Sequence, residues 1–338
     1  MQIKENISLQ PFNSFGIEVY AKYFASFNSI DQLQELIAST QHKKNTHLIL
    51  GGGSNILFTK NIEALVMKNE IEGVEVIEEQ DDFILVQVGA GMNWHQFVVY
   101  CIHHGYAGIE NLALIPGSIG ASPMQNIGAY GVEIKDVFHS LEAIDIHDGN
   151  TKIFTNAECE FGYRESIFKN KYKDQFVITS VTYRLSKKPV FNTTYGAIQQ
   201  EIDEMGIKDL SIKAIAQAVM NIRNSKLPDP LKIGNAGSFF KNPEIETGEF
   251  EKLKVAFPSL VGYPTKKDII KIPAGWLIEQ AGWKGFREGD AGCYDKQALV
   301  LVNYGKATGL QILDLSERII KSVQSTFGIL LQREVNVY

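Results

Sequence analysis

The sequence predicts an α+β fold of at least two structural units, and three observations support this prediction. Helical periodicity and strand-like alternation both occur, but the strand signals gather in the middle of the chain instead of alternating regularly with helices. Two glycine-rich segments interrupt the pattern, at 51–55 and within 110–131. The length of 338 residues corresponds to about two domains. The pattern is therefore not that of a regular doubly wound sheet.

The first half of the chain begins with a well-defined helix. Ser29 can cap it, and Gln32 stands three residues later, as in a capping box. The elements that we expect next are strands over 47–50, 56–58 and 83–88 and a helix over 94–102 that Gly105 ends.

The second half begins with strands and ends mostly with helices. Alternation over 141–147, a turn at 148–150 and a return over 152–154 predict a hairpin, and 176–185 is a long strand-like run. The remaining predicted elements are a helix from a Ser211 cap to Pro228, one from Pro273, one over 312–323 stopped by Gly328, and a final strand over 330–337.

Composition and charge exclude several classes of protein. Apolar residues make up 44% and charged residues 21%, which excludes a disordered chain, a coiled coil and a disulfide mini-protein. The net charge of −6 is unlike that of a general nucleic-acid binder, although a local basic pocket can still hold an anion. Residues 1–18 lack the apolar core of a signal peptide, and no run is long enough to span a membrane. We expect a cytoplasmic protein that binds neither membrane nor nucleic acid.

The cysteines and histidines show no ligand spacing. The chain has three cysteines, Cys101, Cys159 and Cys293, and no two of them are close in sequence. This odd number and wide spacing argue against a disulfide framework or a CxxC site. The seven histidines form no HExxH-like pattern. We expect structural cysteines and no metal site.

The first glycine-rich segment, Gly-Gly-Gly-Ser-Asn at 51–55, follows a predicted strand. Consecutive backbone N–H groups in such a turn can bind an anion such as a diphosphate. A Rossmann loop would open a helix, but the next residues, Ile-Leu-Phe, favour a strand. A tight turn between two strands is the alternative.

The second segment, 110–131, is rich in glycine, serine and proline, yet too apolar for a solvated linker. Because buried backbone groups need partners, something must hold this loop, and a flat cofactor with a diphosphate would do so. Two such loops without a Rossmann helix indicate a flavin in a cleft between two α+β lobes.

Three residues have the chemistry of catalytic groups. Arg164 lies among aromatic and apolar residues and could bind a carboxylate through two hydrogen bonds; a surface ion pair is the alternative. Ser238 follows a glycine and precedes two phenylalanines, so it could donate a proton in a water-poor pocket; it could also be an ordinary serine. Glu334 lies in the final predicted strand, and alternation directs it away from Arg333 and Val335. An ordinary surface carboxylate on an edge strand is the alternative to a catalytic role.

Taken together and in order, these segments resemble the UDP-N-acetylenolpyruvoylglucosamine reductase (MurB) family of bacterial cell-wall synthesis. The matching blocks are Asn-Ser-Phe-Gly at 13–16, Gly-Gly-Gly-Ser-Asn at 51–55, Ile-Pro-Gly at 115–117, Gln-Asn-Ile-Gly-Ala-Tyr-Gly at 125–131, Phe-Gly-Tyr-Arg at 161–164, Gly-Ser-Phe-Phe-Lys-Asn-Pro at 237–243 and Glu-Val at 334–335. Each block is weak alone, but seven in family order are specific. Thr-Tyr-Gly at 194–196 resembles the type I subgroup.

The resemblance implies a two-lobed FAD-binding domain of the vanillyl-alcohol-oxidase (PCMH) type plus a C-terminal α+β substrate-binding domain. We expect lobe 1 over 1–70, to which 335–338 can return, lobe 2 over 71–208, and the substrate domain over 209–334. It also implies an oxidoreductase acting on a CH–CH group. This enzyme would be a monomer with non-covalent FAD that uses NADPH to reduce UDP-N-acetylglucosamine enolpyruvate to UDP-N-acetylmuramate for peptidoglycan synthesis.

The resemblance also implies a role for each reactive residue. Arg164 would bind the enolpyruvyl carboxylate and stabilise the enolate charge, and Ser238 would give a proton to the ether-bearing carbon. Glu334 must hold or share a proton, so we expect burial to raise its pKa. Arg333 stands where many members have proline, and a cation there could lower that pKa, although alternation separates the two side chains. The implied substrate-binding residues are Tyr195, Lys226, Asn242 and Gln297, and the implied cofactor-binding residues are Gly51, Gly52, Gly53, Ser54, Asn55, Pro116, Gly117, Ser118, Ser122, Ile127, Ile178 and Arg223.

Overall fold

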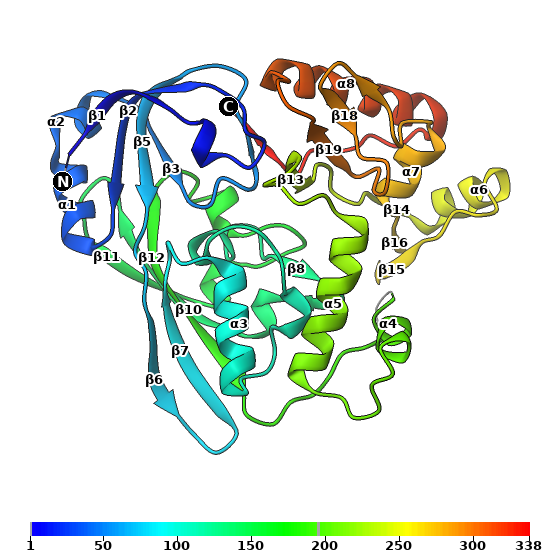
Figure 1. Ribbon diagram of the computed structural model, residues 1–338, viewed down its shortest axis with the longest axis horizontal. Coiled ribbons are helices and arrows are strands. Elements are labelled where there is room, and N and C mark those ends of the chain that lie inside the picture. The colour runs from blue at the N-terminus through cyan, green and yellow to red at the C-terminus, as the bar shows by residue number, and fades with distance from the viewer. Residues whose placement is uncertain (1, 195–196) are drawn as a thin grey trace. The chain divides into compact units, whose positions relative to one another are not determined.

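A computed structural model describes residues 2–194 and 197–338 (Figure 1). The chain divides into two compact units, and each is composed of several separate stretches. The larger unit contains Met1–Ile7, Tyr20–Gly53 and Ile62–Ser225, and the smaller contains Ser8–Val19, Ser54–Asn61 and Lys226–Tyr338. The predicted division at 70 and 208 stays a prediction.

The first sheet of the larger unit is mostly parallel. Its order is β1 (Lys4–Ser8), β2 (Tyr20–Phe27), β5 (Ile62–Asn69) and β3 (His47–Leu50), with β2 and β3 both parallel to β5. Helix α1 (Ile30–Ala38) connects two of these strands, followed by α2 (Thr40–Lys44). The Ser29 side chain accepts a hydrogen bond from the Gln32 backbone nitrogen at 3.3 Å, which confirms the predicted cap.

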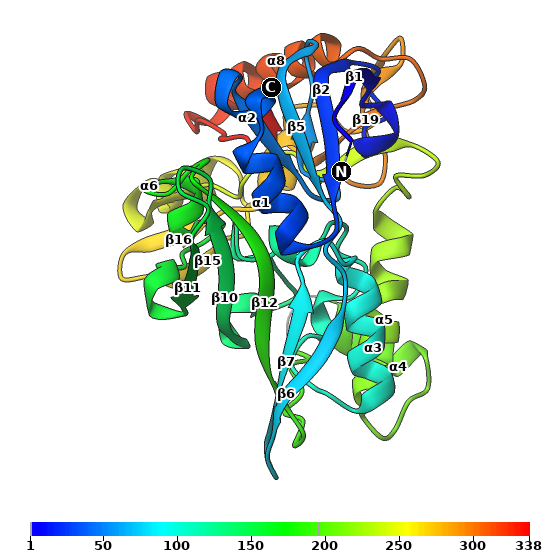
Figure 2. The same ribbon diagram turned by 90° about the vertical axis from the view of Figure 1, so that its left-hand side faces the viewer.

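The second sheet of the larger unit is antiparallel. Its order is β11 (Thr151–Thr155), β10 (Phe138–Asp145), β12 (Phe176–Ser186), β7 (Phe83–Gly89) and β6 (Val74–Glu79), and β10–β11 is the predicted hairpin. Helices α3 (Trp94–His104) and α5 (Ile212–Lys226) lie on the same side of this sheet (Figure 2). One buried core joins the sheet to both helices.

The smaller unit is also mixed. Its main sheet runs β13 (Gly234–Ser238), β19 (Val300–Asn303), β18 (Ala291–Cys293) and β17 (Arg287–Glu288). The helices α7 (Ala274–Gln280) and α8 (Gly309–Phe327) have the predicted positions, and Gly328 ends α8 with a left-handed backbone. A second sheet has the order β14 (Glu244–Glu246), β16 (Ile269–Lys271) and β15 (Tyr263–Lys266).

Short elements complete the described part of the chain. They are the helices α4 (Ile198–Glu204) and α6 (Thr247–Ala256), the paired strands β4 (Ile56–Leu57) with β20 (Asn336–Val337) and β8 (Gly128–Ala129) with β9 (Val132–Glu133), and the 3-10 helices η1 (Gln10–Phe12), η2 (Glu110–Leu112), η3 (Ile119–Ala121), η4 (Ile134–Asp136), η5 (Ala157–Cys159) and η6 (Ile167–Lys169).

The final strand differs from its prediction. In place of a continuous strand over 330–337, the segment has an isolated bridge at Arg333 and only β20 as regular strand. The reason is a change of partner, because Glu334 donates its backbone N–H to the Phe239 carbonyl oxygen, whereas Asn336 donates to Asn55. One flat strand cannot pair with both.

The three cysteines are buried in the cores, as their apolar surroundings predicted. Burial raises the pKa of the Cys159 and Cys293 thiols to about 12 each, and it raises the pKa of Cys101 as well. Thiols with such raised pKa values remain protonated and unreactive at neutral pH.

Candidate active site

The two glycine-rich loops lie against each other in the larger unit. A Cβ atom placed on Gly51 would come within 2.5 Å of Ser118 Oγ, and one on Gly52 within 2.8 Å of Gly117 Cα. Only glycine permits so close an approach of two backbones. Gly53, at φ +62°, turns the chain out of this contact. The loops that the sequence singled out separately therefore form one cradle of closely packed backbone.

The chain itself holds the second loop. The Gly117 carbonyl accepts from the Trp94 backbone nitrogen at 3.0 Å, and Ile119 donates to the Met92 carbonyl at 2.9 Å. Ser118 forms an isolated bridge with Asn93. A cofactor is thus not needed to satisfy these backbone groups, which corrects one premise of the sequence argument.

Some predicted cofactor-binding residues are part of the surrounding core. The Ser122 hydroxyl is 2.7 Å from the buried Tyr183 Oη, and Ile178 belongs to the β12 core, with its carbonyl accepting from Asn69. Ile127 is half-buried and donates to the Ser122 carbonyl. Pro116 is exposed at the start of the loop.

Arg223 places a half-buried cation with a buried Nε atom in the larger unit. Among the described residues its Nε meets no hydrogen-bond partner. Burial lowers the pKa of its guanidinium, while the nearby Tyr130 opposes that shift. The pKa of His95 is also lowered, by burial and by Arg223. A guanidinium whose buried Nε meets no partner favours an anionic or carbonyl-rich ligand, and together with the glycine cradle it fits FAD.

Arg164 lies in a tight turn of the same unit. Its Nη2 donates to the Gly128 carbonyl at 2.7 Å, in strand β8. Tyr130, which is close enough to Arg223 to affect its pKa, lies in the turn of that same β8–β9 hairpin. The hairpin thus bonds to Arg164 and lies near Arg223, the two arginines to which the sequence analysis gave a functional role.

The smaller unit brings Ser238 and Glu334 close together. Ser238 ends β13 and precedes the fully buried Phe239. The Glu334 backbone nitrogen donates to the Phe239 carbonyl at 2.9 Å, and Phe240 bridges Arg333. Two residues almost one hundred positions apart are therefore neighbours on paired segments. Ser238 is exposed and Glu334 is half-buried.

Arg333 is directed away from its neighbour Glu334. Its Nε donates to Ser316 Oγ at 2.8 Å and its Nη2 to Glu317 Oε1 at 2.5 Å, both on α8. Strand alternation predicted that the two side chains point apart, and the bonds of Arg333 to α8 agree with this for the Arg333 side chain. The charge of Arg333 is paired on the helix.

The predicted substrate-binding residues of the smaller unit gather partly at the start of α7. Asn242 Oδ1 accepts from the Ala274 backbone nitrogen at 2.9 Å, and Gln297 Oε1 would be 2.9 Å from a Cβ on Gly275. Lys226 is exposed at the end of α5. Tyr195 lies outside the described residues.

Asn55, predicted to contact the cofactor, is next to the glutamate in the smaller unit. Its Nδ2 donates to the Glu334 carbonyl at 3.4 Å, and its own carbonyl accepts from Asn336. Ser54 is half-buried beside it.

Sequence reasoning missed two polar residues in the larger unit. Asn126 is fully buried and has φ +44°, and His95 Nδ1 accepts from the Leu114 backbone nitrogen at 3.1 Å. Neither residue belongs to a sequence motif with a recognisable spacing. The only available signal was asparagine within a glycine-rich segment, because asparagine tolerates the left-handed region.

Comparisons with known proteins extend this geometry. The family described as "FAD binding domain" matches residues 21–155. A solved structure from Thermus caldophilus, a UDP-N-acetylenolpyruvylglucosamine reductase (MurB), superposes with a TM-score of 0.69 at 22% identity, covering 100% of this chain and 99% of that one. The fold, the cradle and this family match thus define a flavoprotein, with an FAD-binding domain and a separate C-terminal domain. The predicted α+β fold class is confirmed.

The family follows from closer relatives. The family described as "UDP-N-acetylenolpyruvoylglucosamine reductase, C-terminal domain" matches residues 229–338. A reductase of that name from Flavobacterium johnsoniae is 52% identical over 338 residues, covering 100% of both chains. Another from Amoebophilus asiaticus is 48% identical, covering 100% of this chain and 99% of the relative. The chain belongs to the UDP-N-acetylenolpyruvoylglucosamine reductase family.

In the described parts of the chain, we find no helix with both the length and the apolar character needed to cross a bilayer.

Proposed function

We propose that this protein uses NADPH and FAD to reduce UDP-N-acetylglucosamine enolpyruvate to UDP-N-acetylmuramate, a step in peptidoglycan precursor synthesis. The observation that carries the proposal is the pairing in the smaller unit that puts Glu334 next to the Ser238 strand, with a 2.9 Å bond from Glu334 to Phe239. A lone serine and a lone glutamate would be unremarkable, but a hydroxyl and a carboxyl group on paired segments suit reduction of a polarised double bond.

FAD, when bound, supplies the hydride that it has received from NADPH. In the larger unit, the residues that would hold it are the glycines of the cradle, Ser118 and the half-buried Arg223. Backbone N–H groups in a glycine-rich turn suit a diphosphate. Ser122, Ile127 and Ile178 would act as packing groups around the ring system, because their polar atoms already have partners within the protein.

Arg164 would bind the carboxylate of the enolpyruvyl group. Addition of hydride to the terminal carbon pushes negative charge onto this carboxylate as an enolate. A guanidinium already held in place, here by the 2.7 Å bond to the Gly128 carbonyl, stabilises that charge without having to reorganise. The arginine therefore lowers the barrier for the second half of the reaction only.

Ser238 would then give its proton to the carbon that bears the ether oxygen, and the product is the lactyl ether. Serine is a weak acid, so a neighbouring group has to assist it. Glu334 is a candidate, because its backbone bonds to the residue after Ser238. We propose that Lys226, Asn242, Gln297 and Tyr195 hold the UDP-sugar, with Lys226 as a point charge for phosphate.

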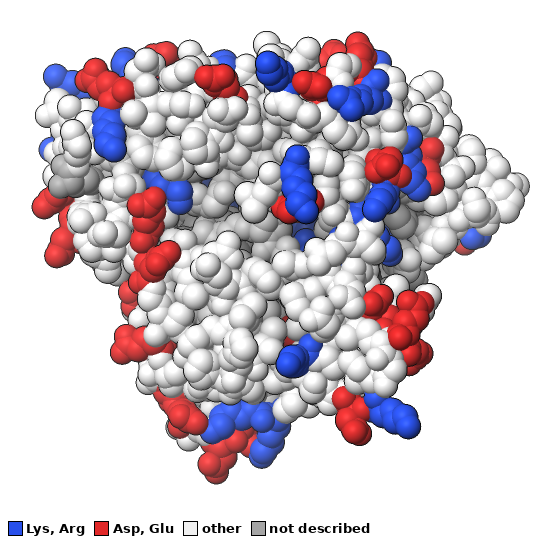
Figure 3. Space-filling model, viewed as in Figure 1, with Lys and Arg blue, Asp and Glu red and all other residues white. Residues whose placement is uncertain are grey.

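The surface charge fits a small ligand held by local groups. In Figure 3, basic and acidic side chains are interspersed over the viewed face of the described residues, and the net charge is −6. We place the protein in the cytoplasm, where NADPH and nucleotide sugars are available, and we expect a monomer by light scattering.

An anaerobic spectroscopic experiment tests the proposal. The flavin of the purified protein is bleached with one equivalent of NADPH, and UDP-N-acetylglucosamine enolpyruvate is then added. Rapid return of the oxidised spectrum supports the proposed reaction. A flavin that stays reduced until oxygen is admitted would overturn it in favour of an oxidase. A protein that cannot take up FAD would overturn the cofactor assignment itself.

A further inference from the structure

The turn that carries Arg164 has a backbone conformation that is unusual for its residue. Gly162 and Glu165 exchange backbone hydrogen bonds of 3.0 and 3.3 Å across it, and Arg164 stands at φ +56°. A positive φ at the third position of a β-turn normally belongs to glycine or asparagine, because a Cβ atom disfavours it. The position of Arg164 therefore depends on neighbours that hold the turn in this conformation.

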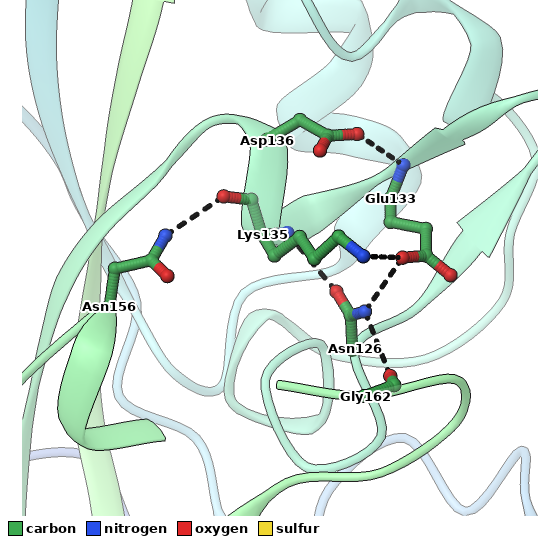
Figure 4. A network of polar contacts seen from close by, with 6 residues as sticks. All are labelled: Asn126, Glu133, Lys135, Asp136, Asn156 and Gly162. Carbon is green, nitrogen blue, oxygen red and sulfur yellow. Dashed lines mark hydrogen bonds and ion pairs between the residues drawn. The ribbon is translucent and has the colours of Figure 1, made fainter. Parts of the chain in front are cut away.

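Asn126 provides such a contact from the buried base of the β8–β9 hairpin (Figure 4). Its Nδ2 donates to the Gly162 carbonyl oxygen and to Glu133 Oε2, each at 3.0 Å. Its Oδ1 accepts from the Lys135 backbone nitrogen at 3.1 Å. Asn126 is 0% exposed, so water cannot replace a bond that is lost. All three bonds together fix the orientation of the amide.

A charged pair strengthens this arrangement. Glu133 Oε2, which accepts from Asn126, also lies 2.6 Å from Lys135 Nζ. The Glu133 backbone nitrogen donates to Asp136 Oδ2 at 2.9 Å, which closes the start of η4. Hydrogen bonds to ionised acceptors are about twice as strong as neutral ones. The Asn126 amide is thus anchored on the side away from the Arg164 turn.

The same short segment holds the turn at two further points. Arg164 Nη2 donates to the Gly128 carbonyl at 2.7 Å, and Ser166 Oγ donates to the Met124 carbonyl at 2.7 Å. On the 124–128 segment the Asn126 bond lies between these two contacts, and it reaches the first residue of the turn, Gly162, whereas the other two come from Arg164 and Ser166. We propose that Asn126 is a positioning residue, which holds the backbone of the turn so that the Arg164 guanidinium is aimed at the substrate carboxylate. The inference rests on the function proposed above for Arg164.

Two substitutions test it in the FAD-loaded enzyme. Asn126→Gly removes the three side-chain bonds but keeps a residue suited to φ +44°. Asn126→Asp keeps the shape but replaces the donor with an acceptor facing Glu133 and the Gly162 carbonyl. In stopped-flow experiments, we expect flavin reoxidation by UDP-N-acetylglucosamine enolpyruvate to slow about 10- to 100-fold in both. Bleaching by NADPH and the FAD content should stay near wild type, because neither involves Arg164.

Asn156→Ala is the matched control. Asn156 Nδ2 donates to the Lys135 and Phe138 carbonyls at 2.8 and 3.1 Å, in the same network but without contact to the turn (Figure 4). This variant should leave both half-reactions unchanged. If Asn126→Gly slows NADPH bleaching as much as reoxidation, or loses FAD, Asn126 has only a structural role and the proposal is wrong.

A double-mutant cycle separates this inference from the proposed function. Added to Arg164→Ala, the Asn126→Gly change should cost no further rate, because its effect passes through the arginine. If Asn126→Gly slows reoxidation as much in the Arg164→Ala background as in the wild type, the inference about Asn126 is overturned, but the proposed function is not. If Arg164→Ala itself leaves reoxidation intact, the proposed role of Arg164 fails instead.

Discussion

Alanine at the two adjacent glycines of the first loop should have very different consequences. A Cβ on Gly51 would meet Ser118 Oγ at 2.5 Å, with the Ser118 Cβ farther away at 3.7 Å. A Cβ on Gly52 would meet Gly117 Cα at 2.8 Å and its carbonyl carbon at 3.1 Å. A hydroxyl can rotate away, but a backbone cannot. Gly52→Ala must therefore push the two halves of the cradle apart, whereas Gly51→Ala need only turn one side chain.

The size of the difference follows from the cost of overpacking, which is typically about 1–3 kcal/mol. We expect a cost of about 1 kcal/mol for Gly51→Ala and about 3 kcal/mol for Gly52→Ala, because the Gly52 contact is with fixed atoms. If that strain is relieved by opening the cradle, FAD affinity falls by the same amount. The dissociation constant for FAD should then rise about 5-fold for Gly51→Ala and about 100-fold for Gly52→Ala.

The assay is titration of the apoprotein with FAD, followed by flavin fluorescence, with urea unfolding to measure the stability of each apoprotein. Ser118→Ala supplies a rescue, because it removes Oγ and leaves only the ordinary 3.7 Å contact. Gly51→Ala combined with Ser118→Ala should bind FAD as well as Ser118→Ala alone. Equal effects of alanine at the two glycines, or wild-type affinity for Gly52→Ala, would refute the cradle.

Three further predictions concern single side chains. Ser238→Ala should retain bound flavin and NADPH bleaching but lose about 10²- to 10⁴-fold in reoxidation by the enolpyruvyl substrate; near-wild-type turnover would remove it as the proton donor. Burial lowers the pKa of His42, so the unfolded chain binds its proton more readily and the unfolding free energy falls as pH drops below about 6.5. His42→Gln should flatten that fall in urea titrations at pH 8 and pH 5, and an unchanged slope would contradict the assignment. Arg333→Gln breaks bonds to Ser316 and Glu317 and should cost about 1–2 kcal/mol of stability; a changed pH profile of flavin reoxidation would show instead that Arg333 acts on the neighbouring glutamate.

Local signals in the sequence predicted local structure well. The helix caps at Ser29 and Ser211 and the stops at Gly105 and Gly328 all hold, because each depends on bonds within a few residues. The parallel strands β2 and β5 were missed. A parallel pair needs a crossover and non-local partners, and no short window of sequence reports those.

The division into units shows another limit of sequence reasoning. The smaller unit takes two short stretches, Ser8–Val19 and Ser54–Asn61, from the first fifth of the chain. The boundary between Gly53 and Ser54 cuts through a single motif. Residues that are contiguous in a motif thus belong to different compact units, and composition shows no shift at such a crossing.

The pairing of the catalytic candidates could not be predicted from the residues alone for the same reason. Ser238 and Glu334 are brought together by main-chain bonds, from Lys241 to the Gln332 carbonyl and from Glu334 to the Phe239 carbonyl, each at 2.9 Å. Main-chain bonds carry no side-chain signature, so any sequence with the right strand geometry can make them. The resemblance to a known family located both residues because selection acts on their chemistry. The structure adds the reason for their proximity: a short two-segment ladder that ends where the last residues turn to pair with β4.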